Sequence, residues 1–432
     1  MSATVIRANF LILTTTVTWP GCGSVEPAGD TTTGPGGPAS SSESSGTSSP
    51  TTGGESGAGD ATGSTSPLTT GSTSTTDTST GAPPPGDSSD ESGADEPTAE
   101  PLPCVATTFC SSATEEGACR RELTLPDGNI LFYWANLSLE PTAEEAGCNA
   151  RVDRAVLVQH GNQRTPWSYF NYMQEAATIA GVEDRTLIVA PWFPAEEDVT
   201  PPGFARWTSG GWKGGDGSIF PPSISSFSVY DHIVSTLLLD ASVHPQLADV
   251  VFAGHSAGAQ FAQRYAVASD LGGGEAPAAT FRWLVANPSS YLYLDPFRWD
   301  QLGAPPDVNF TIPAGTECDD SYDDYKYGLA NLSPGHYVAK HLADIPALYL
   351  DRDVTYLLGE DDIETDPDVD DLDGTCPAEL QGVHRLQRGL VFTGFLDARY
   401  PQQLHDTVTV PGVGHSAGGM FTSSQGVAAL FP

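Results

Sequence analysis

The chain has 432 residues, with 55 acidic and 18 basic side chains, so its formal net charge at neutral pH is −37. A surface this acidic repels nucleic acid and anionic membranes, which argues against either as an electrostatic partner. The length would suit two or three average domains, but residues 1–103 have too few apolar side chains to form a core. We therefore predict one folded domain, over residues 104–432.

The N-terminal segment has the pattern of an export signal. Arg7 provides a positive charge, and Phe10 opens a short apolar stretch. We predict a signal peptide over residues 1–21, because this stretch is too short to cross a membrane as a helix. Cys22 follows a glycine, as in a bacterial lipoprotein cleavage site, so lipid anchoring at Cys22 and simple secretion both stay open. Either way we expect the protein to be secreted or held in the cell envelope of a bacterium.

The next segment, residues 22–103, is rich in Ser, Thr, Gly and Pro and has no aromatic side chain. Such a segment cannot bury enough apolar area to offset the entropy lost on ordering. We predict a disordered linker that holds the folded domain away from the cell envelope.

From Cys104 onward, apolar runs typical of strands alternate with helical patterns. Strands are expected over residues 121–125, 130–134, 155–159, 186–190, 281–286, 354–358 and 407–410, and along the run that begins at Asp249. Helices are expected over residues 166–180, 227–239, 378–398 and 421–430. The alternation predicts an α/β domain with a mainly parallel central sheet and helices on both faces. Residues from about 291 to 345 show no clean period, and we interpret them as an insertion over the site.

The clearest chemical motif is Gly-His-Ser-Ala-Gly at residues 254–258, which follows an apolar strand and precedes a helical pattern. A strand, a sharp G-x-S-x-G turn and a helix form a nucleophile elbow. Such a turn brings strand and helix so close that side chains at Gly254 and Gly258 would clash. Ser256 would be exposed at the helix N-terminus, where N–H groups and the helix dipole favour a developing oxyanion.

The same five letters recur at residues 414–418, so the motif alone does not identify the nucleophile. In a fold built around such an elbow, the order along the chain is Ser, acid, His. No acid–histidine pair follows Ser416, so Ser256 is the candidate nucleophile. His415 then becomes the candidate base, because it lies in a Gly-rich loop after the last expected strand.

These motifs together resemble the α/β-hydrolase fold superfamily, and within it secreted serine esterases. The resemblance covers residues from about 121 to 432 and depends on His160-Gly161, the motif at 254–258, and the Gly-Glu-Asp-Asp run at 359–362 with Gly414-His415. It implies a catalytic triad of Ser256, His415 and Asp362, with Asp361 as the near rival of Asp362 and Glu360 as the third choice.

The same resemblance implies an oxyanion hole formed by two backbone N–H groups. One belongs to Ala257 and the other to Asn162, with Gly161 as the next choice. His160 is expected to shape its loop rather than transfer protons, and His255 is expected to be a packing residue.

The function that these residues indicate is hydrolysis of carboxylic esters, of small molecules or polymers, through an acyl-enzyme. We expect a monomer that needs no cofactor and no metal. Two alternatives stay open. The triad would also serve a serine peptidase, although no added domain for peptide selection is evident. A non-catalytic binding protein on the same fold is the second alternative, and intact candidate residues argue against it.

Six cysteines follow Cys22, an even number that indicates disulfides in an oxidising compartment. Cys318–Cys376 is our preferred long-range pair, since it is what remains if the first four pair among themselves. Trp192, Trp207 and Trp212 either line an acyl pocket or pack a long loop.

A dense acidic run at residues 360–373 could supply calcium ligands from Asp366, Asp368, Asp370 and Asp371. The EF-hand pattern fails there, however, because Asp371 stands where a glycine is needed and Pro377 stands in place of the bidentate Glu. A solvated acidic loop is therefore our preferred interpretation.

Overall fold

The computed structural model describes residues 103–105, 108–115, 117–219, 223–271, 279–305, 307–314, 317–369 and 371–432. The predicted signal peptide, Cys22 and the predicted linker up to residue 102 lie outside these residues, as does Asp370. None of the helices in the described ranges is both long enough and apolar enough to cross a membrane.

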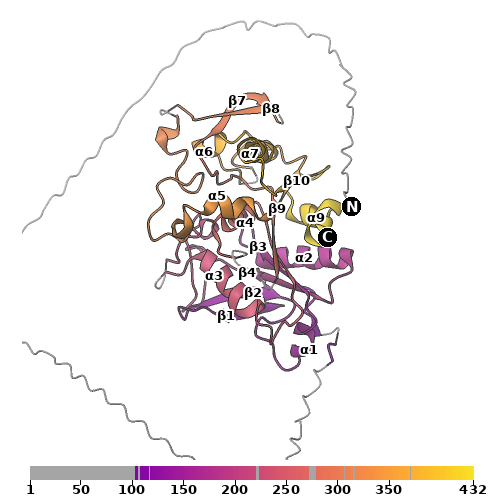
Figure 1. Ribbon diagram of the computed structural model, residues 1–432. Helices are drawn as coiled ribbons and strands as arrows, with labels where there is room; N and C mark the ends of the chain where they lie inside the picture. Colours follow the sequence, from indigo (N-terminus) through magenta and orange to yellow (C-terminus); the bar gives the residue numbers. More distant parts are fainter. Residues whose placement is uncertain are drawn as a thin grey trace, which may run out of the picture. The chain divides into compact units, whose positions relative to one another are not determined.

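The centre of the folded domain is one eight-stranded sheet (Figure 1). Its strands lie in the spatial order β1 (Arg120–Thr124), β2 (Ile130–Ala135), β4 (Thr186–Pro191), β3 (Arg154–Gln159), β5 (Asp249–His255), β6 (Thr280–Ala286), β9 (Asp353–Gly359) and β10 (Asp406–Val410). β1, β2 and β4 pair antiparallel, and the pairs from β4 to β10 are parallel. The predicted α/β class with a mainly parallel sheet is confirmed.

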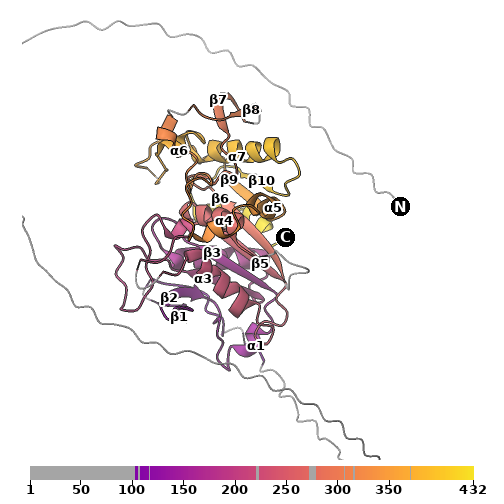
Figure 2. The same cartoon turned by 60° about the vertical axis from the view of Figure 1, so that its left-hand side comes forward.

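Helices cover both faces of this sheet (Figures 1 and 2). In β3, Ala155 and Leu157 belong to one buried cluster, whereas Val156 and Val158 belong to the other, because side chains alternate along a strand. The first cluster is completed by α3 (Ser226–His232), α4 (Ala257–Ala268), α5 (Ile345–Leu350) and α7 (Arg385–Arg399). The second is completed by α2 (Pro166–Ala180), α8 (Ala417–Thr422) and α9 (Ser424–Leu430).

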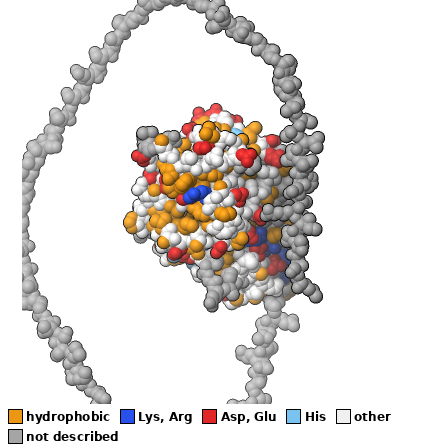
Figure 3. Space-filling model, turned by 45° about the horizontal axis from the view of Figure 1, so that its top comes forward, with side chains coloured by type: hydrophobic (Ala, Val, Ile, Leu, Met, Phe, Trp, Pro, Cys, Tyr) orange, Lys and Arg blue, Asp and Glu red, His pale blue; other side chains and the backbone are white. Residues whose placement is uncertain are grey.

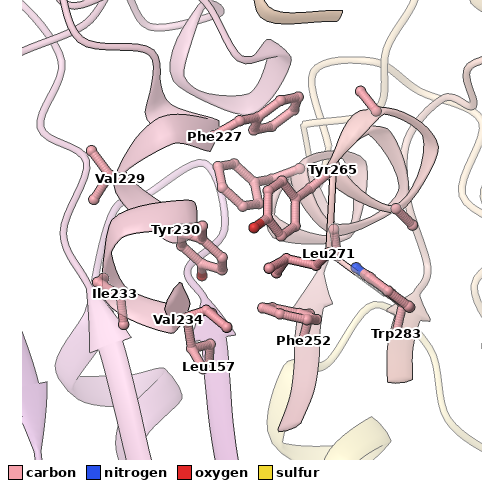
Figure 4. Close-up of a cluster of buried hydrophobic side chains, with 14 of the residues drawn as sticks. Leu157, Phe227, Val229, Tyr230, Ile233, Val234, Phe252, Tyr265, Leu271 and Trp283 are labelled. Atoms are coloured by element: carbon pink, nitrogen blue, oxygen red, sulfur yellow. The ribbon is translucent and has the colours of Figure 1, made fainter. Parts of the chain in front are cut away.

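Aromatic side chains pack α4 against the sheet and fix its position (Figure 4). The ring of Tyr265, in α4, lies 5.3 Å from that of Phe252 in β5 and 5.4 Å from that of Tyr230 in α3. All three are almost fully buried, and each buried aromatic contributes roughly 1.5–3 kcal/mol of transfer free energy. Because Ser256 lies directly before α4, this packing also fixes the position of its side chain.

Three segments that were predicted as single helices are divided in the structure. The helix predicted over 227–239 continues from α3 as a π-helix, η3 (Ile233–Leu238). The one predicted over 378–398 is interrupted and forms α6 (Cys376–Glu379) and α7. The closing helix breaks at Ser423, whose hydroxyl accepts from the Gly426 N–H and so begins α9 as a new helix.

The remaining elements lie in connections between strands. α1 (Ala146–Asn149) precedes β3, and the 3₁₀ turn η2 (Trp212–Gly214) lies between β4 and α3. The region from 291 to 345 has an antiparallel hairpin of β7 (Arg298–Ala304) and β8 (Asp307–Thr311), which the sequence analysis did not predict. It also has the 3₁₀ turns η4 (Glu317–Asp320) and η5 (Tyr337–His341).

All six cysteines after Cys22 form disulfides, namely Cys104–Cys148, Cys110–Cys119 and Cys318–Cys376. The prediction that the first four pair among themselves, with Cys318–Cys376 as the long-range bond, is confirmed. This bond ties the region after the β7–β8 hairpin to α6.

Candidate active site

The turn between β5 and α4 has the backbone of a nucleophile elbow. Ser256 has φ 58° and ψ −122°, a conformation that side-chain-bearing residues rarely adopt. A Cβ added to Gly254 would lie 2.1 Å from the carbonyl oxygen of Gly258, and one added to Gly258 would lie 2.2 Å from that of Gln159. Both glycines are therefore required by the close approach of β3, β5 and α4.

The three candidate catalytic side chains form one hydrogen-bonded chain. His415 Nε2 lies 3.0 Å from Ser256 Oγ, and His415 Nδ1 lies 2.8 Å from Asp362 Oδ2. Asp362 is 1% exposed, whereas Asp361 points to solvent. Glu360 is exposed too and accepts a hydrogen bond from the Thr409 hydroxyl. Of the three acids, Asp362 is the one that contacts the imidazole.

Neighbouring side chains hold this chain in place from two sides. Arg385 Nη1 lies 3.7 Å from Asp362 Oδ1, and both side chains are buried. Asn287, at the end of β6, accepts from the Gly359 N–H at 2.8 Å and donates to the Gly414 carbonyl at 3.4 Å. Asn287 thus connects the end of β9 with the loop that bears the imidazole, a role that the sequence analysis did not assign.

His255 packs beneath the candidate base. Its ring centroid is 4.5 Å from that of His415. Burial, together with the nearby His415 and Arg385, holds the pKa of His255 well below its usual value. His255 therefore stays neutral and adds no positive charge beside the candidate base His415.

The loop after β3 brings a second backbone segment to Ser256. Asn162 and Ala257 line one cavity together with Ser256. As the first residue of α4, Ala257 has no carbonyl partner for its N–H within the helix. No acceptor for the Asn162 N–H is found among the described residues. Both residues of the predicted oxyanion hole thus line the same cavity as Ser256.

His160 shapes this loop through both ring nitrogens. The Phe193 N–H donates to His160 Nε2 at 3.0 Å, so His160 Nδ1 bears the proton and donates to the Gly161 carbonyl at 3.0 Å. Burial lowers the pKa of His160 to about 3, so the ring is neutral near neutral pH. The geometry agrees with a structural role for His160 and offers no proton transfer.

Arg164 is the residue of this loop that sequence reasoning missed. Its Nη1 donates to the Asn162 carbonyl at 3.0 Å. Its remaining donors bind Asp198 at 2.5 Å and Glu197 at 2.7 Å. The guanidinium thus fixes the peptide next to the Asn162 N–H. The sequence gives no local sign of this role. The partners Glu197 and Asp198 come some 33 positions later in the chain, and only the fold brings them close to Arg164.

Two cavities flank Ser256. One, of about 290 Å³, is lined by Ser256, His415, Tyr169 and Tyr172 among others. The second, of about 310 Å³, contains Ser256, Ala257 and Asn162 but not the imidazole. A larger cavity of about 670 Å³ lies at the opposite ends of β6 and β9, where Thr280 and Asp353 begin these strands. It is therefore remote from the candidate catalytic chain.

The three tryptophans of the long loop pack the interior. Trp207 and Trp212 are fully buried in the first cluster, and Trp192 stacks on Phe132 at 6.2 Å. None of them lines either cavity beside Ser256. The loop-packing interpretation is confirmed for this site.

The acidic run contributes Asp371, which lines both cavities. Asp366 and Asp368 are exposed, and the Asp368 N–H donates to the Asp366 carboxylate. Within the described ranges, no three His, Cys, Asp or Glu side chains are arranged to bind a metal ion.

Comparison with protein-family models and with curated proteins finds no match. Solved structures that resemble this one include a poly(3-hydroxybutyrate) depolymerase from Bordetella parapertussis, with 21% identity, TM-score 0.44, and 70% of this chain and 86% of that chain covered. Poly(aspartic acid) hydrolase-1 from Sphingomonas sp. KT-1 has 19% identity, TM-score 0.45, and coverage of 73% and 99%. An S-formylglutathione hydrolase from Agrobacterium tumefaciens has 13% identity, TM-score 0.37, and coverage of 72% and 94%.

The classification follows from the topology itself. Two antiparallel strands precede a parallel set in which β3 lies between β4 and β5, and the elbow follows β5. Ser256 therefore lies at the carboxyl ends of the strands, at the point where the strand order reverses. With this sheet and this elbow, the described part of the chain has the α/β-hydrolase fold.

Proposed function

We propose that this protein is an exported serine hydrolase that cleaves carboxylic esters through an acyl-enzyme. One observation supports the proposal most strongly. A single imidazole, that of His415, lies within hydrogen-bond distance of both a strained serine and a buried carboxylate. A serine hydroxyl needs such a base, and the base needs a carboxylate that fixes its tautomer.

Each of the three hydrogen-bonded side chains has a defined task in this mechanism. His415 Nε2 takes the proton of Ser256 as Oγ attacks the ester carbonyl, and Asp362 stabilises the imidazolium through Nδ1–H. The N–H groups of Ala257 and Asn162 bind the oxyanion of the tetrahedral intermediate. His415 returns the proton to the leaving alcohol, and the same base then activates the water that releases the acid.

The test compares the two copies of the Gly-His-Ser-Ala-Gly motif. Ser256→Ala is expected to abolish both fluorophosphonate labelling and hydrolysis of a p-nitrophenyl ester series. Ser416→Ala is the matched control, since Ser416 only caps α8 through the Gly419 N–H. Retained labelling in Ser256→Ala would disprove the assignment. Wild-type protein that cleaves peptides but no ester would favour the peptidase alternative, and protein that is never labelled would favour the binding alternative.

Export and anchoring are part of the same proposal. Three disulfides support an oxidising compartment outside the cytosol. The mass of the mature N-terminus tests the rest. A diacylated Cys22 would establish a lipid anchor, an unmodified terminus near residue 22 would establish secretion, and an intact residue 1 would contradict export.

A further inference from the structure

Lysine is rare in this protein, and its distribution is uneven. The whole chain contains three lysines, Lys213, Lys326 and Lys340. Two of them, Lys213 and Lys326, line the cavity of about 310 Å³ that also contains Ser256. On the face shown in Figure 3, basic side chains are few and acidic ones are scattered. Asp371 and Asp373 line the same cavity, so two of the three lysines face two carboxylates beside Ser256.

The two lysines are brought together by bonds between their segments. Lys213 lies in η2, and its carbonyl accepts from Arg264 of α4 at 3.1 Å. The Tyr325 hydroxyl, next to Lys326, donates to the Gly214 carbonyl of the same 3₁₀ turn. The segments are more than 100 residues apart in sequence, so the fold specifically holds both ammonium groups at this cavity. We call it the lysine pocket, and it is the cavity lined by Ser256, Ala257, Lys213 and Lys326.

Neither lysine is held in a direct ion pair, although carboxylates lie in the same cavity. Within the described residues, neither ammonium forms an ion pair or a hydrogen bond, and Lys326 only faces the Tyr327 ring at 5.8 Å. Asp371 and Asp373 line the same cavity, and the Asp373 carboxylate accepts from the hydroxyls of Ser290, Tyr327 and Thr375 rather than from a lysine. Half-buried cations without partners are costly, and a bound anion would remove that cost.

The position of the pocket indicates which part of an ester it would receive. The leaving alcohol must depart next to His415, which returns the proton, and His415 lines the other cavity. The lysine pocket lacks His415 but includes Ala257, one of the two proposed oxyanion donors, whereas Asn162 lines both cavities. The acyl group therefore extends into the lysine pocket.

We propose that Lys213 and Lys326 bind a carboxylate at the far end of the acyl group, so that the preferred substrates are half-esters of dicarboxylic acids. This proposal rests on the proposed esterase function. It gives the enzyme a charge preference on the acyl side and none on the alcohol side.

The pKa values of the two lysines add a dependence on pH. Burial, the neighbouring Lys326 and Arg264 lower the pKa of Lys213 to about 7. Burial and Arg264 lower that of Lys326 to about 8. The other charged or titratable groups that face them are Asp216, Tyr325, Tyr327, Asp371 and Asp373. Since lysine binds an anion only when protonated, the preference should fade as the pH rises from 6.5 to 9.

The experiment compares initial rates on two matched p-nitrophenyl esters, an adipic acid half-ester and the same ester with a terminal carboxamide. At pH 6.5 the wild-type kcat/KM is expected to be at least tenfold higher for the half-ester. Lys213→Met and Lys326→Met should each lower this ratio about tenfold, the effect of losing one charge-assisted hydrogen bond. Lys340→Met is the control, because Lys340 lies over the Tyr337 ring outside the pocket, and its ratio should not change.

The outcomes distinguish a failure of the lysine-pocket proposal from a failure of the proposed esterase function. If the carboxamide ester is hydrolysed in a Ser256-dependent manner but the half-ester has no advantage, or both Met variants keep the ratio, the lysine pocket is wrong while the esterase stands. A preference that appears only when the carboxylate is on the leaving phenol overturns the acyl-side assignment. If neither ester is cleaved and no fluorophosphonate labels Ser256, both proposals fail.

Discussion

The buried imidazole of His160 should make the folded state sensitive to acid. Its two hydrogen bonds require a neutral ring, and burial lowers its pKa to about 3 from a usual value of 6.5. Between these values the unfolded chain binds a proton that the folded chain excludes. Stability therefore rises with pH across this window, and it is lost as the pH falls below 6.5.

The size of the effect follows from the same two pKa values. A pH of 5 lies about 1.5 units below the pKa of the imidazole in the unfolded chain. Each unit corresponds to about 1.36 kcal/mol of free energy. His160 should thus cost about 2 kcal/mol of unfolding free energy at pH 5 relative to pH 7.5. The side chain is fully buried, so no discount for solvent screening applies.

The assay is urea denaturation at pH 7.5 and pH 5, followed by tryptophan fluorescence, for wild type and His160→Gln. The glutamine oxygen can still accept from the Phe193 N–H, and the variant loses stability at both pH values. Its loss between pH 7.5 and 5 should be about 2 kcal/mol smaller than that of the wild type. His341→Gln, which removes a partly exposed histidine, should show no such reduction. An equal pH dependence in wild type and His160→Gln would refute the reasoning.

Three further predictions concern the site and its support. Asp362→Asn should lower kcat/KM about 10³–10⁴-fold because it favours the wrong tautomer of the proposed base, whereas Asp361→Asn should change it less than threefold; equal effects in ester assays would contradict the geometry. Arg164→Met should lower kcat about tenfold with little change in KM, since a displaced oxyanion donor acts in the transition state; a pure KM effect would argue against this role. Replacing Cys318 and Cys376 by Ala opens a loop with a sequence separation of 58 residues and should lower the unfolding free energy by about 4 kcal/mol, and an unchanged urea midpoint would show that the bond does not constrain the unfolded chain.

Much of the fold was predictable because its evidence is local. The apolar runs of β3, β4 and β9 are bounded by turn residues, and the structure extends β3 and β4 by one residue and β9 by two. Helix α2 was predicted with its observed ends, because Pro166 can begin a helix and Gly181 ends it in a left-handed conformation. The break between α6 and α7 was missed, since the apolar pattern continues across it.

In the candidate site, too, some residues could be predicted from the sequence and others could not. Ser256 and His415 follow from sequence spacing and chain order, and a choice between Asp361 and Asp362 needed the structure to show which side chain is buried. Arg164 and Asn287 could not be found from the sequence, because Arg164 is held by acids of a distant loop and Asn287 bonds a distant loop in turn. Lone polar residues reveal such roles only after the chain has folded.

The scarcity of lysine has a practical consequence for anyone who handles this protein. Amine-reactive dyes, cross-linkers and activated resins attack unprotonated amines, and the lowered pKa values of Lys213 and Lys326 raise the unprotonated fraction of these side chains above that of an ordinary lysine. Immobilisation through amines would thus compete directly with the acyl side of the proposed site. Coupling through exposed carboxylates outside the lysine pocket, such as that of Asp184, would leave that side open.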